Sequence, residues 1–365
     1  MSVLDYLTSN IKDIITYQPG KPIEYVAKEL GLAPESIAKL ASNENPLGPS
    51  PKAIKVMRQA IKGVNIYPDG GAYDLKDKLA EHYNLKPSNF IVGNGSNELL
   101  EFIAHCFMSN DTSVIASEYS FIVYKMMAKM FGAEFLEVPA KALGHDISKF
   151  HKYIKPNTRV IFVCNPNNPT GTFLNSRQID AFMKKIPNDV LVVFDEAYAE
   201  ISQSKMPDTL KYVAERDNVI VLRTFSKAYG LAGLRIGYGI ASENLIQALE
   251  KPRQPFNTNM LAQVAAVAAL DDRAFVNKSK RLFKAGIKEM VEFCEQRNIE
   301  YIKPVANFML IKVGNGQKVF EELQVKGIIV RPMGGYGLNE WIRISFGTET
   351  ENKKMFIALS EVLNG

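Results

Sequence analysis

Short apolar runs alternate with longer amphipathic stretches from about residue 51 onward. The stretches, such as PKAIKVMRQAIKG, have the residue spacing of helices. The runs are NFIVG (89–93), TSVIAS (112–117), TRVIFVC (158–164), DVLVVFD (189–195) and NVIVLRT (218–224). Continuous apolar runs of this length are typical of strands that are buried on both faces. The pattern therefore predicts an α/β fold with a mostly parallel sheet covered by helices.

The two ends of the chain have a different pattern. Residues 1–50 contain proline-rich patches at 17–22 and 43–49, and prolines this dense exclude a helix interior or a central strand. We therefore expect an arm or loops there. A charged helix near 272–298, a second near 317–326 and the strand-like runs FMLIKV, GIIVRPM and WIRISFG predict a smaller α+β lobe. We place a large domain at 46–269, and a small domain with the N-terminal arm at 270–365 and 1–45.

Composition narrows the class of protein. A chain of 365 residues is long for one hydrophobic core. Hydrophobic residues at 46% and charged residues at 23% are typical of a soluble globular protein. No apolar run approaches the roughly 18–20 residues of a membrane span. The start, MSVLDYLTSNIKDI, has acidic residues and no apolar block, unlike a secretory signal. We expect a cytoplasmic protein that binds no membrane.

Charge and cysteine usage exclude further classes. Lys and Arg total 44 against 39 Asp and Glu, a net charge of +5 that suits anionic small substrates but includes no basic cluster for nucleic acid. The three cysteines, Cys106, Cys164 and Cys294, lie far apart and predict free thiols rather than disulfides. The four histidines have no metal-ligand spacing, so we expect no metal site.

Each of the five predicted strands ends in a polar cluster. The clusters are Gly-Asn-Gly-Ser-Asn, Ser-Glu-Tyr-Ser, Asn-Pro-Asn-Asn-Pro, Asp-Glu-Ala-Tyr and Thr-Phe-Ser-Lys. Ligands of open α/β sheets bind at the carboxyl ends of the strands. We therefore expect the functional site where these clusters meet.

The first cluster predicts an anion cradle rather than a nucleotide site. Residues 93–98 begin like GxGxxG, but Glu98 stands where the third glycine is needed, and the chain has no GxxxxGK[ST] segment. A Gly-rich turn before the helical NELLEFIAHCF presents backbone N–H groups to an anion. Thr224, Ser226 and Arg235 could add donors to the same phosphate. An ordinary strand-to-helix turn is the alternative interpretation.

Asp195 and Lys227 follow two of these strands. Burial at the end of an apolar strand raises a carboxyl pKa unless a cation pairs with it; the alternative is that Asp195 caps the next helix. A lysine beside hydroxyls and near Arg235 can have a lowered pKa and act as a Schiff-base nucleophile; the alternative is a solvated surface lysine. A phosphate cradle, a buried Asp and such a lysine together are the groups that pyridoxal 5′-phosphate (PLP) requires.

The motifs identify a resemblance to fold-type I PLP-dependent aminotransferases, closest to the histidinol-phosphate aminotransferase family. They occur in the order of that family over nearly the whole chain: Asn43-Glu44-Asn45-Pro46, Tyr67-Pro68-Asp69, Gly93 to Glu98, Asn165 to Gly171, Asp195-Glu196-Ala197-Tyr198, Thr224 to Lys227, Gly233 to Tyr238, Arg253 to Asn257 and Arg343-Ile344-Ser345. The resemblance implies the fold-type I architecture, with a large domain and a smaller α+β domain.

The resemblance also implies roles for individual residues. Lys227 would form the Schiff base, and Asp195 would pair with the pyridine nitrogen. Asn168 and Tyr198 would contact the ring's 3′ oxygen. Tyr119 would stack on the ring, although the stacking aromatic of relatives often follows Pro-Thr and Tyr119 follows Ser117-Glu118. The phosphate would be held by Gly95, Ser96, Asn97, Thr224, Ser226 and Arg235, joined by Tyr67 from the neighbouring subunit of a homodimer.

The substrate of this family requires a site for two kinds of anion. Histidinol phosphate carries a phosphate where glutamate carries an α-carboxylate, and guanidinium groups bind both. The resemblance gives Arg343 to the carboxylate. Arg331 lies twelve residues before it in another predicted strand, so both could face the cleft. Tyr17 in the arm is a further candidate donor. A surface role is the alternative for Arg331 and Tyr17.

The implied reaction is transamination of L-histidinol phosphate with 2-oxoglutarate, in which Lys227 moves the proton and the kinetics are ping-pong. Three alternatives stay open. An aminotransferase for aromatic amino acids would use the same cofactor residues. An enzyme like phosphothreonine decarboxylase shares much of the sequence pattern. A PLP-binding protein without turnover is the third, since a fold alone does not establish catalysis.

Overall fold

The computed structural model describes residues 2–12, 14 and 22–364, and within them seven strands form one central sheet. The strands, in sheet order, are β2 (Phe90–Gly93), β8 (Gly237–Ala241), β7 (Val219–Thr224), β6 (Leu191–Asp195), β5 (Thr158–Cys164), β3 (Ser113–Ser117) and β4 (Glu134–Val138). β8 is antiparallel to both of its neighbours, and the other neighbouring pairs are parallel. We call the part of the chain built on this sheet the large lobe.

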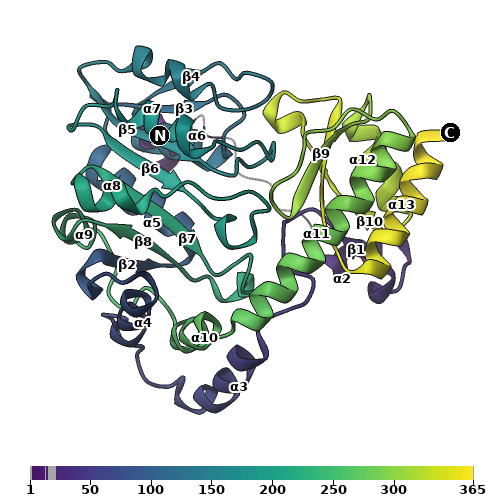
Figure 1. Ribbon diagram of the computed structural model, residues 1–365, viewed down its shortest axis with the longest axis horizontal. Helices are drawn as coiled ribbons and strands as arrows, with labels where there is room; N and C mark the ends of the chain where they lie inside the picture. The colour runs from purple at the N-terminus through teal and green to yellow at the C-terminus, as the bar shows by residue number, and fades with distance from the viewer. Residues whose placement is uncertain (1, 13, 15–21, 365) are drawn as a thin grey trace.

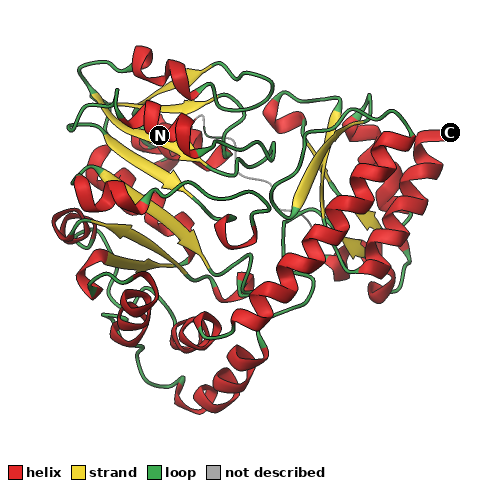
Figure 2. Ribbon diagram, viewed as in Figure 1, coloured by secondary structure: helices red, strands yellow, loops and turns green. Residues whose placement is uncertain are grey.

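The central strands are apolar throughout because both of their faces are covered. Val163 and Phe194 belong to one buried cluster, whereas Phe162 and Val193 beside them belong to a second cluster across the sheet. Successive side chains of a strand point to opposite faces, so a strand between two cores needs an uninterrupted apolar run. Figure 2 shows helices on both faces of the sheet. The predicted α/β arrangement is confirmed.

The helices divide between these two cores. Helices α5 (Gly95–Phe107), α6 (Ile122–Phe131) and α9 (Glu243–Leu249) supply the cluster on one face. The cluster on the other face includes side chains from α3 (Pro51–Ala60), α4 (Tyr73–Tyr83), α7 (Ser176–Met183), α8 (Leu210–Glu215) and α10 (Met260–Leu270). Short 3-10 helices lie at η1 (Val3–Tyr6), η2 (Pro34–Ser36), η3 (Ile61–Gly63), η4 (Pro87–Asn89), η5 (Ile147–Tyr153), η6 (Ala199–Ile201), η7 (Ala232–Leu234) and η8 (Gly334–Tyr336).

Helix α11 (Arg273–Gln296) extends from the large lobe into a second unit, which we call the small lobe (Figure 1). Its 24 residues span about 36 Å. The described small lobe has a three-stranded antiparallel sheet of β11 (Arg331–Pro332), β12 (Trp341–Ser345) and β9 (Phe308–Lys312), with α12 (Gly316–Val325) and α13 (Glu349–Asn364). The division of the chain at residue 270 stays a prediction.

The described N-terminal residues contact both lobes. Helix α1 (Ser9–Lys12) lies near α6, and Asn10 Nδ2 donates a 3.2 Å hydrogen bond to Asn110 Oδ1. After α2 (Ile23–Leu30), strand β1 (Ala38–Lys39) pairs in parallel with β10 (Ile328–Ile329) of the small lobe. This part of the arm therefore contacts the small lobe, and its assignment to the small domain stays a prediction. Among the described helices, none is long and apolar enough to traverse a bilayer.

Candidate active site

The five polar clusters lie at the carboxyl ends of parallel strands, as predicted. Asp195 is the last residue of β6, and its Cα pairs with Cys164 on β5 and Leu222 on β7. The side chain is 4% exposed, and Oδ2 accepts a 2.7 Å hydrogen bond from the Tyr124 hydroxyl. Burial raises the pKa of Asp195, which the Tyr124 hydroxyl and the Ala197 amide oppose. Asp195 is thus a buried carboxylate in the middle of the sheet.

Lys227 lies three residues beyond β7 and is partly buried. Its Nζ donates a 3.1 Å hydrogen bond to the backbone oxygen of Ser42 and lies 5.9 Å from the ring centroid of Tyr198. Tyr198 follows Asp195 by three residues, so its ring links the segment after β6 to Lys227. Burial, with the positive charges of Arg343 and Arg235, lowers the pKa of Lys227 to about 8.

The predicted phosphate residues gather at the start of α5. Gly95 has φ +71°, and a Cβ there would lie 2.5 Å from Nη2 of Arg235, so glycine alone fits. The Arg235 guanidinium donates to the backbone oxygen of Asn94 at 3.3 Å and to Ser226 Oγ at 3.5 Å. Thr224 Oγ1 donates to Ser226 Oγ at 2.9 Å. Two further predicted residues lie in the first turn of α5: Ser96 and Asn97.

Arg343 connects the small lobe to this cluster. Its guanidinium donates to Asn168 Oδ1 at 2.5 Å and to the backbone oxygen of Ala41 at 2.6 Å, and the side chain is 7% exposed. Arg331 on β11 is the direct cross-strand partner of Arg343 on β12. Directly paired residues of an antiparallel sheet lie on the same face. Both arginines therefore lie on one face of this sheet, and the expectation that they face the cleft stays a prediction.

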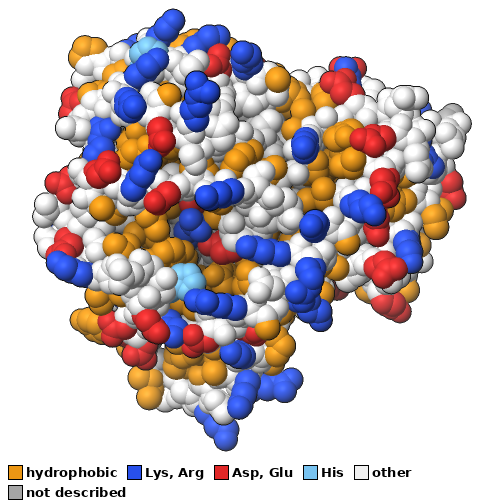
Figure 3. Space-filling view, in the orientation of Figure 1, with side chains coloured by type: hydrophobic (Ala, Val, Ile, Leu, Met, Phe, Trp, Pro, Cys, Tyr) orange, Lys and Arg blue, Asp and Glu red, His pale blue; other side chains and the backbone are white. Residues whose placement is uncertain are grey.

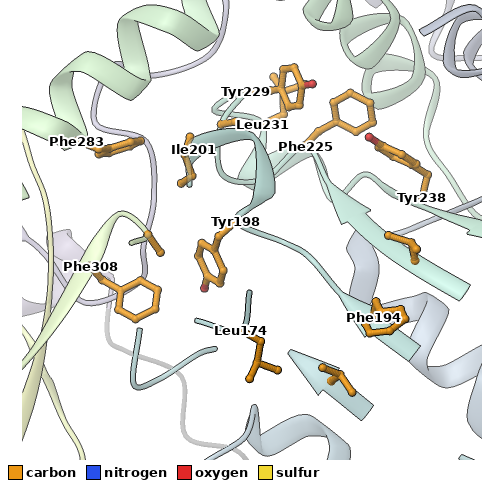
Figure 4. Close-up of a cluster of buried hydrophobic side chains, with 14 of the residues drawn as sticks. Leu174, Phe194, Tyr198, Ile201, Phe225, Tyr229, Leu231, Tyr238, Phe283 and Phe308 are labelled. Atoms are coloured by element: carbon orange, nitrogen blue, oxygen red, sulfur yellow. The ribbon is translucent and has the colours of Figure 1, made fainter. Parts of the chain in front are cut away.

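Hydrogen bonds that the sequence analysis did not predict hold the hydroxyl of Tyr198 in place. The Tyr198 hydroxyl accepts from Asn43 Nδ2 at 3.0 Å, and burial raises its pKa. Ser345 Oγ donates to Asn43 Oδ1 at 2.8 Å, and Asn307 Nδ2 donates to the Asn43 backbone oxygen at 3.0 Å. Asn43 and Ser345 both stand in the family motifs, which was the available signal. In Figure 4 the ring of Tyr198 lies beside Phe308 of β9, with an edge-to-face distance of 5.2 Å between centroids.

Tyr119 is the residue that the sequence analysis expects to stack on the ring. Tyr119 has φ +55°, and its backbone oxygen accepts from Asn167 Nδ2 at 2.9 Å. Its side chain packs against a small-lobe cluster that includes Trp341. The Phe121 ring instead meets the ring of Tyr124 edge to face at 5.7 Å, and Tyr124 bonds to Asp195. The role given to Tyr119 stays a prediction.

The remaining predicted residues are Tyr67 and Tyr17. Tyr67 is 79% exposed and stacks on Phe256 at 4.8 Å between ring centroids. The expectation that it serves a neighbouring subunit stays a prediction. Tyr17 lies outside the described residues. Among the predicted residues, Arg343 bonds to Asn168, Arg235 bonds to Ser226, and the charges of Arg343 and Arg235 act on Lys227.

Residues 35–359 match the family described as aminotransferase class I and II. The chain belongs to this family. Two relatives of this aminotransferase extend over its whole length. A histidinol-phosphate aminotransferase from Akkermansia muciniphila is 50% identical over 364 residues, covering 100% of both chains. Histidinol-phosphate aminotransferase 1 from Dechloromonas aromatica is 44% identical over 364 residues, also covering 100% of both.

A solved structure agrees with this assignment. The crystal structure of histidinol-phosphate aminotransferase from Sinorhizobium meliloti in complex with pyridoxal-5′-phosphate has a TM-score of 0.90 to this aminotransferase, at 27% sequence identity. The match covers 98% of each chain. The predicted fold class, a PLP-dependent transferase fold of type I, is confirmed.

Proposed function

We propose that this aminotransferase transfers the amino group of L-histidinol phosphate to 2-oxoglutarate with PLP as cofactor. The products are imidazole acetol phosphate and L-glutamate, in a step of histidine biosynthesis. The observation that carries the proposal is the 50% identity over the full length to a histidinol-phosphate aminotransferase. Relatives that are this similar from end to end usually retain the substrate-binding groups as well as the fold.

The residues present fit PLP. Asp195 Oδ1 is buried and has no hydrogen-bond partner within bonding distance among the described residues. It can therefore accept a hydrogen bond from the protonated ring nitrogen of PLP. The turn at Gly95 has no space for a side chain beside Arg235, and it leaves helix N–H groups and a guanidinium for a phosphate. Lys227, with its lowered pKa, supplies the amine. These groups therefore match the ring, the phosphate and the aldehyde of the cofactor.

Bound PLP supplies an aldehyde that takes up the amine of the substrate and a ring that accepts the electrons left when Cα loses its proton. Asp195 holds a proton on the ring nitrogen through its carboxylate. Lys227 Nζ removes the proton from the substrate Cα and returns a proton, since a pKa of about 8 leaves part of the amine uncharged near neutral pH. Asn43 fixes the hydroxyl of Tyr198 so that it can contact the 3′ oxygen.

The substrates are bound through their anionic groups. Arg343 binds the α-carboxylate of glutamate and 2-oxoglutarate, and Arg331 on the same face of the sheet binds the phosphate of histidinol phosphate or the second carboxylate. On the face shown in Figure 3, Lys and Arg side chains gather along the boundary between the two lobes. A net charge of +5 and this arrangement support the attraction of anionic substrates.

The active unit is a homodimer in the cytoplasm. Tyr67 stacks on the exposed Phe256, and exposed apolar side chains are frequent in the chain around it: Ile61, Val64, Ile66 and Tyr73. Exposed apolar groups of this kind typically form contacts with another chain. A second copy that covers them would carry Tyr67 to the phosphate of its neighbour. Free thiols at Cys106, Cys164 and Cys294 support a reducing compartment.

A substrate panel tests the function. Purified enzyme with PLP is given 2-oxoglutarate and either L-histidinol phosphate, phenylalanine or tyrosine, and glutamate formation gives kcat/KM for each donor. We expect histidinol phosphate to be the best donor by at least about tenfold, because an unmatched arginine in the site disfavours a donor without phosphate. A preference for the aromatic amino acids would favour the first alternative. Release of carbon dioxide from phosphothreonine without 2-oxoglutarate would favour the decarboxylase.

A further inference from the structure

Tyr124 joins helix α6 to the carboxylate at the end of β6. It is fully buried, and its hydroxyl donates a 2.7 Å hydrogen bond to Oδ2 of Asp195, 71 residues further along the chain. No family motif of the sequence analysis includes Tyr124. The hydroxyl contacts the Asp195 carboxylate, so any effect of Tyr124 on the site passes through Asp195.

The Tyr124 ring is fixed by two other aromatic rings. It stacks on Phe162 of β5 with 4.5 Å between centroids and an angle of 3° between planes. Phe121 meets it edge to face at 5.7 Å and 85°. Stacked and edge-to-face contacts hold a ring in a defined orientation. The direction of the phenolic O–H toward Asp195 is therefore set by packing before any ligand binds.

The surroundings of Asp195 leave few groups to stabilise its charge. Burial raises the pKa of Asp195, and it also raises the pKa values of the neighbouring Tyr124 hydroxyl and Cys164 thiol, so both neighbours are uncharged. The hydrogen bond from the Tyr124 side chain lowers the pKa of Asp195 and so opposes the effect of burial. Its bond occupies Oδ2, whereas Oδ1 has no partner within bonding distance among the described residues.

We propose that Tyr124 is a positioning residue, which keeps Asp195 ionised and directs its Oδ1 toward the ring nitrogen of the cofactor. The inference rests on the proposed PLP-dependent function. Tyr124 is not a catalytic residue, because its hydroxyl contacts Asp195 rather than a reacting atom.

Tyr124→Phe is the test variant, since it removes the hydroxyl and keeps both ring contacts. Tyr83→Phe is the matched control: it removes a hydroxyl that makes a 2.7 Å bond to Tyr238 at a different site. The dissociation constant of PLP is measured by equilibrium dialysis with the cofactor-free enzyme. A hydrogen bond to a charged group predicts a roughly 10- to 100-fold weaker binding for Tyr124→Phe and no change for Tyr83→Phe. Equal PLP affinity of Tyr124→Phe and wild type would overturn the proposal.

A double-mutant cycle separates this role from a general loss of structure. If Tyr124 acts through Asp195, Tyr124→Phe weakens PLP binding in the wild type but adds no further loss in Asp195→Asn. Additive losses would overturn the proposal. Nitrogen-15 NMR of the bound ring gives an independent readout: the nitrogen is expected to carry less of its proton in Tyr124→Phe. If Asp195→Asn alone leaves PLP affinity unchanged, the cofactor role of Asp195 fails instead.

Discussion

The guanidinium of Arg343 in the small lobe donates a 2.5 Å hydrogen bond to Oδ1 of Asn168 in the loop after β5. A second bond, to the backbone oxygen of Ala41, fixes the other side of the guanidinium. The two bonds hold one buried positive charge between three segments that are distant in sequence. This charge helps to lower the pKa of Lys227.

Replacement of Arg343 by alanine is expected to damage the use of both dicarboxylates. Loss of a charge-assisted, two-point contact should lower kcat/KM for glutamate and 2-oxoglutarate by about 100-fold or more. Steady-state kinetics measures the change. Arg297→Ala is the control, because Arg297 packs on Phe293 and bonds to Ser360 at the far end of α11. Unchanged KM values for both acids in Arg343→Ala would remove Arg343 from the site.

The pKa of Lys227 predicts how PLP attachment depends on pH. Burial lowers this pKa from 10.5 to about 8, so the protonated amine predominates below pH 8 and the reactive amine above it. The rate of PLP attachment to cofactor-free enzyme should rise about tenfold per pH unit below 8 and level off above it. Stopped-flow absorbance gives the rate. With free N-acetyl-lysine as the control, the rise should continue to about pH 10, and the same profile in the enzyme would contradict the lowered pKa.

Mixed dimers test whether Tyr67 serves the neighbouring subunit. Lys227→Ala and Tyr67→Asp chains are each expected to be nearly inactive. In a mixed dimer, the intact Lys227 of one chain would meet the intact Tyr67 of the other, which creates one complete site. Activity should therefore rise when the two variants are unfolded together and refolded. No rise, with dimers present in sedimentation, would place Tyr67 in its own subunit's site or outside the site.

A buried ion pair stabilises the strand ends below the site. Arg223 on β7 contacts Glu196 at 2.5 Å and Glu200 at 2.9 Å, and Glu196 is 0% exposed. Arg223→Met would leave these carboxylates without their cation, so we expect the free energy of unfolding to fall by about 3–5 kcal/mol. Urea unfolding of the cofactor-free enzyme measures it. The double variant Glu196→Gln, Arg223→Met should regain part of the loss; a further loss would contradict this account of the pair.

The strands that could be predicted from the sequence are those in which nearly every side chain is apolar because both faces are buried. Five strands of the central sheet were predicted because each is an apolar run between two cores. Strand β4 was missed because EFLEV at an edge is half polar and partly exposed. Strand β8 was missed because GYGIA contains two glycines, which are more typical of a loop than of a strand. A Cβ on Gly237 would lie 2.5 Å from the backbone nitrogen of Ser96, so close packing across the fold selects that glycine.

The site was predictable to the extent that its residues stand in motifs. Asp195 and Lys227 follow neighbouring strands of the central sheet, so their proximity could be expected from the sheet, whereas Arg343 lies in the separate sheet of the small lobe and was predicted from its motif. The hydrogen-bond partners that orient the site residues could not be predicted. Tyr124 and Asp195 are 71 residues apart, and Asn43 and Tyr198 are 155 apart. No residue spacing signals a hydrogen bond over such separations, because the tertiary packing of α6 and of the arm creates it.

Attachment of the cofactor to one lysine is the most direct test of the central claim. Enzyme loaded with PLP is reduced with borohydride, digested and analysed by mass spectrometry. The account predicts that the mass of the reduced cofactor is found on the peptide that contains Lys227, and that Lys227→Ala enzyme retains none. Stoichiometric modification of a different lysine, with Lys227 unmodified and the enzyme active, would contradict the assignment of this site.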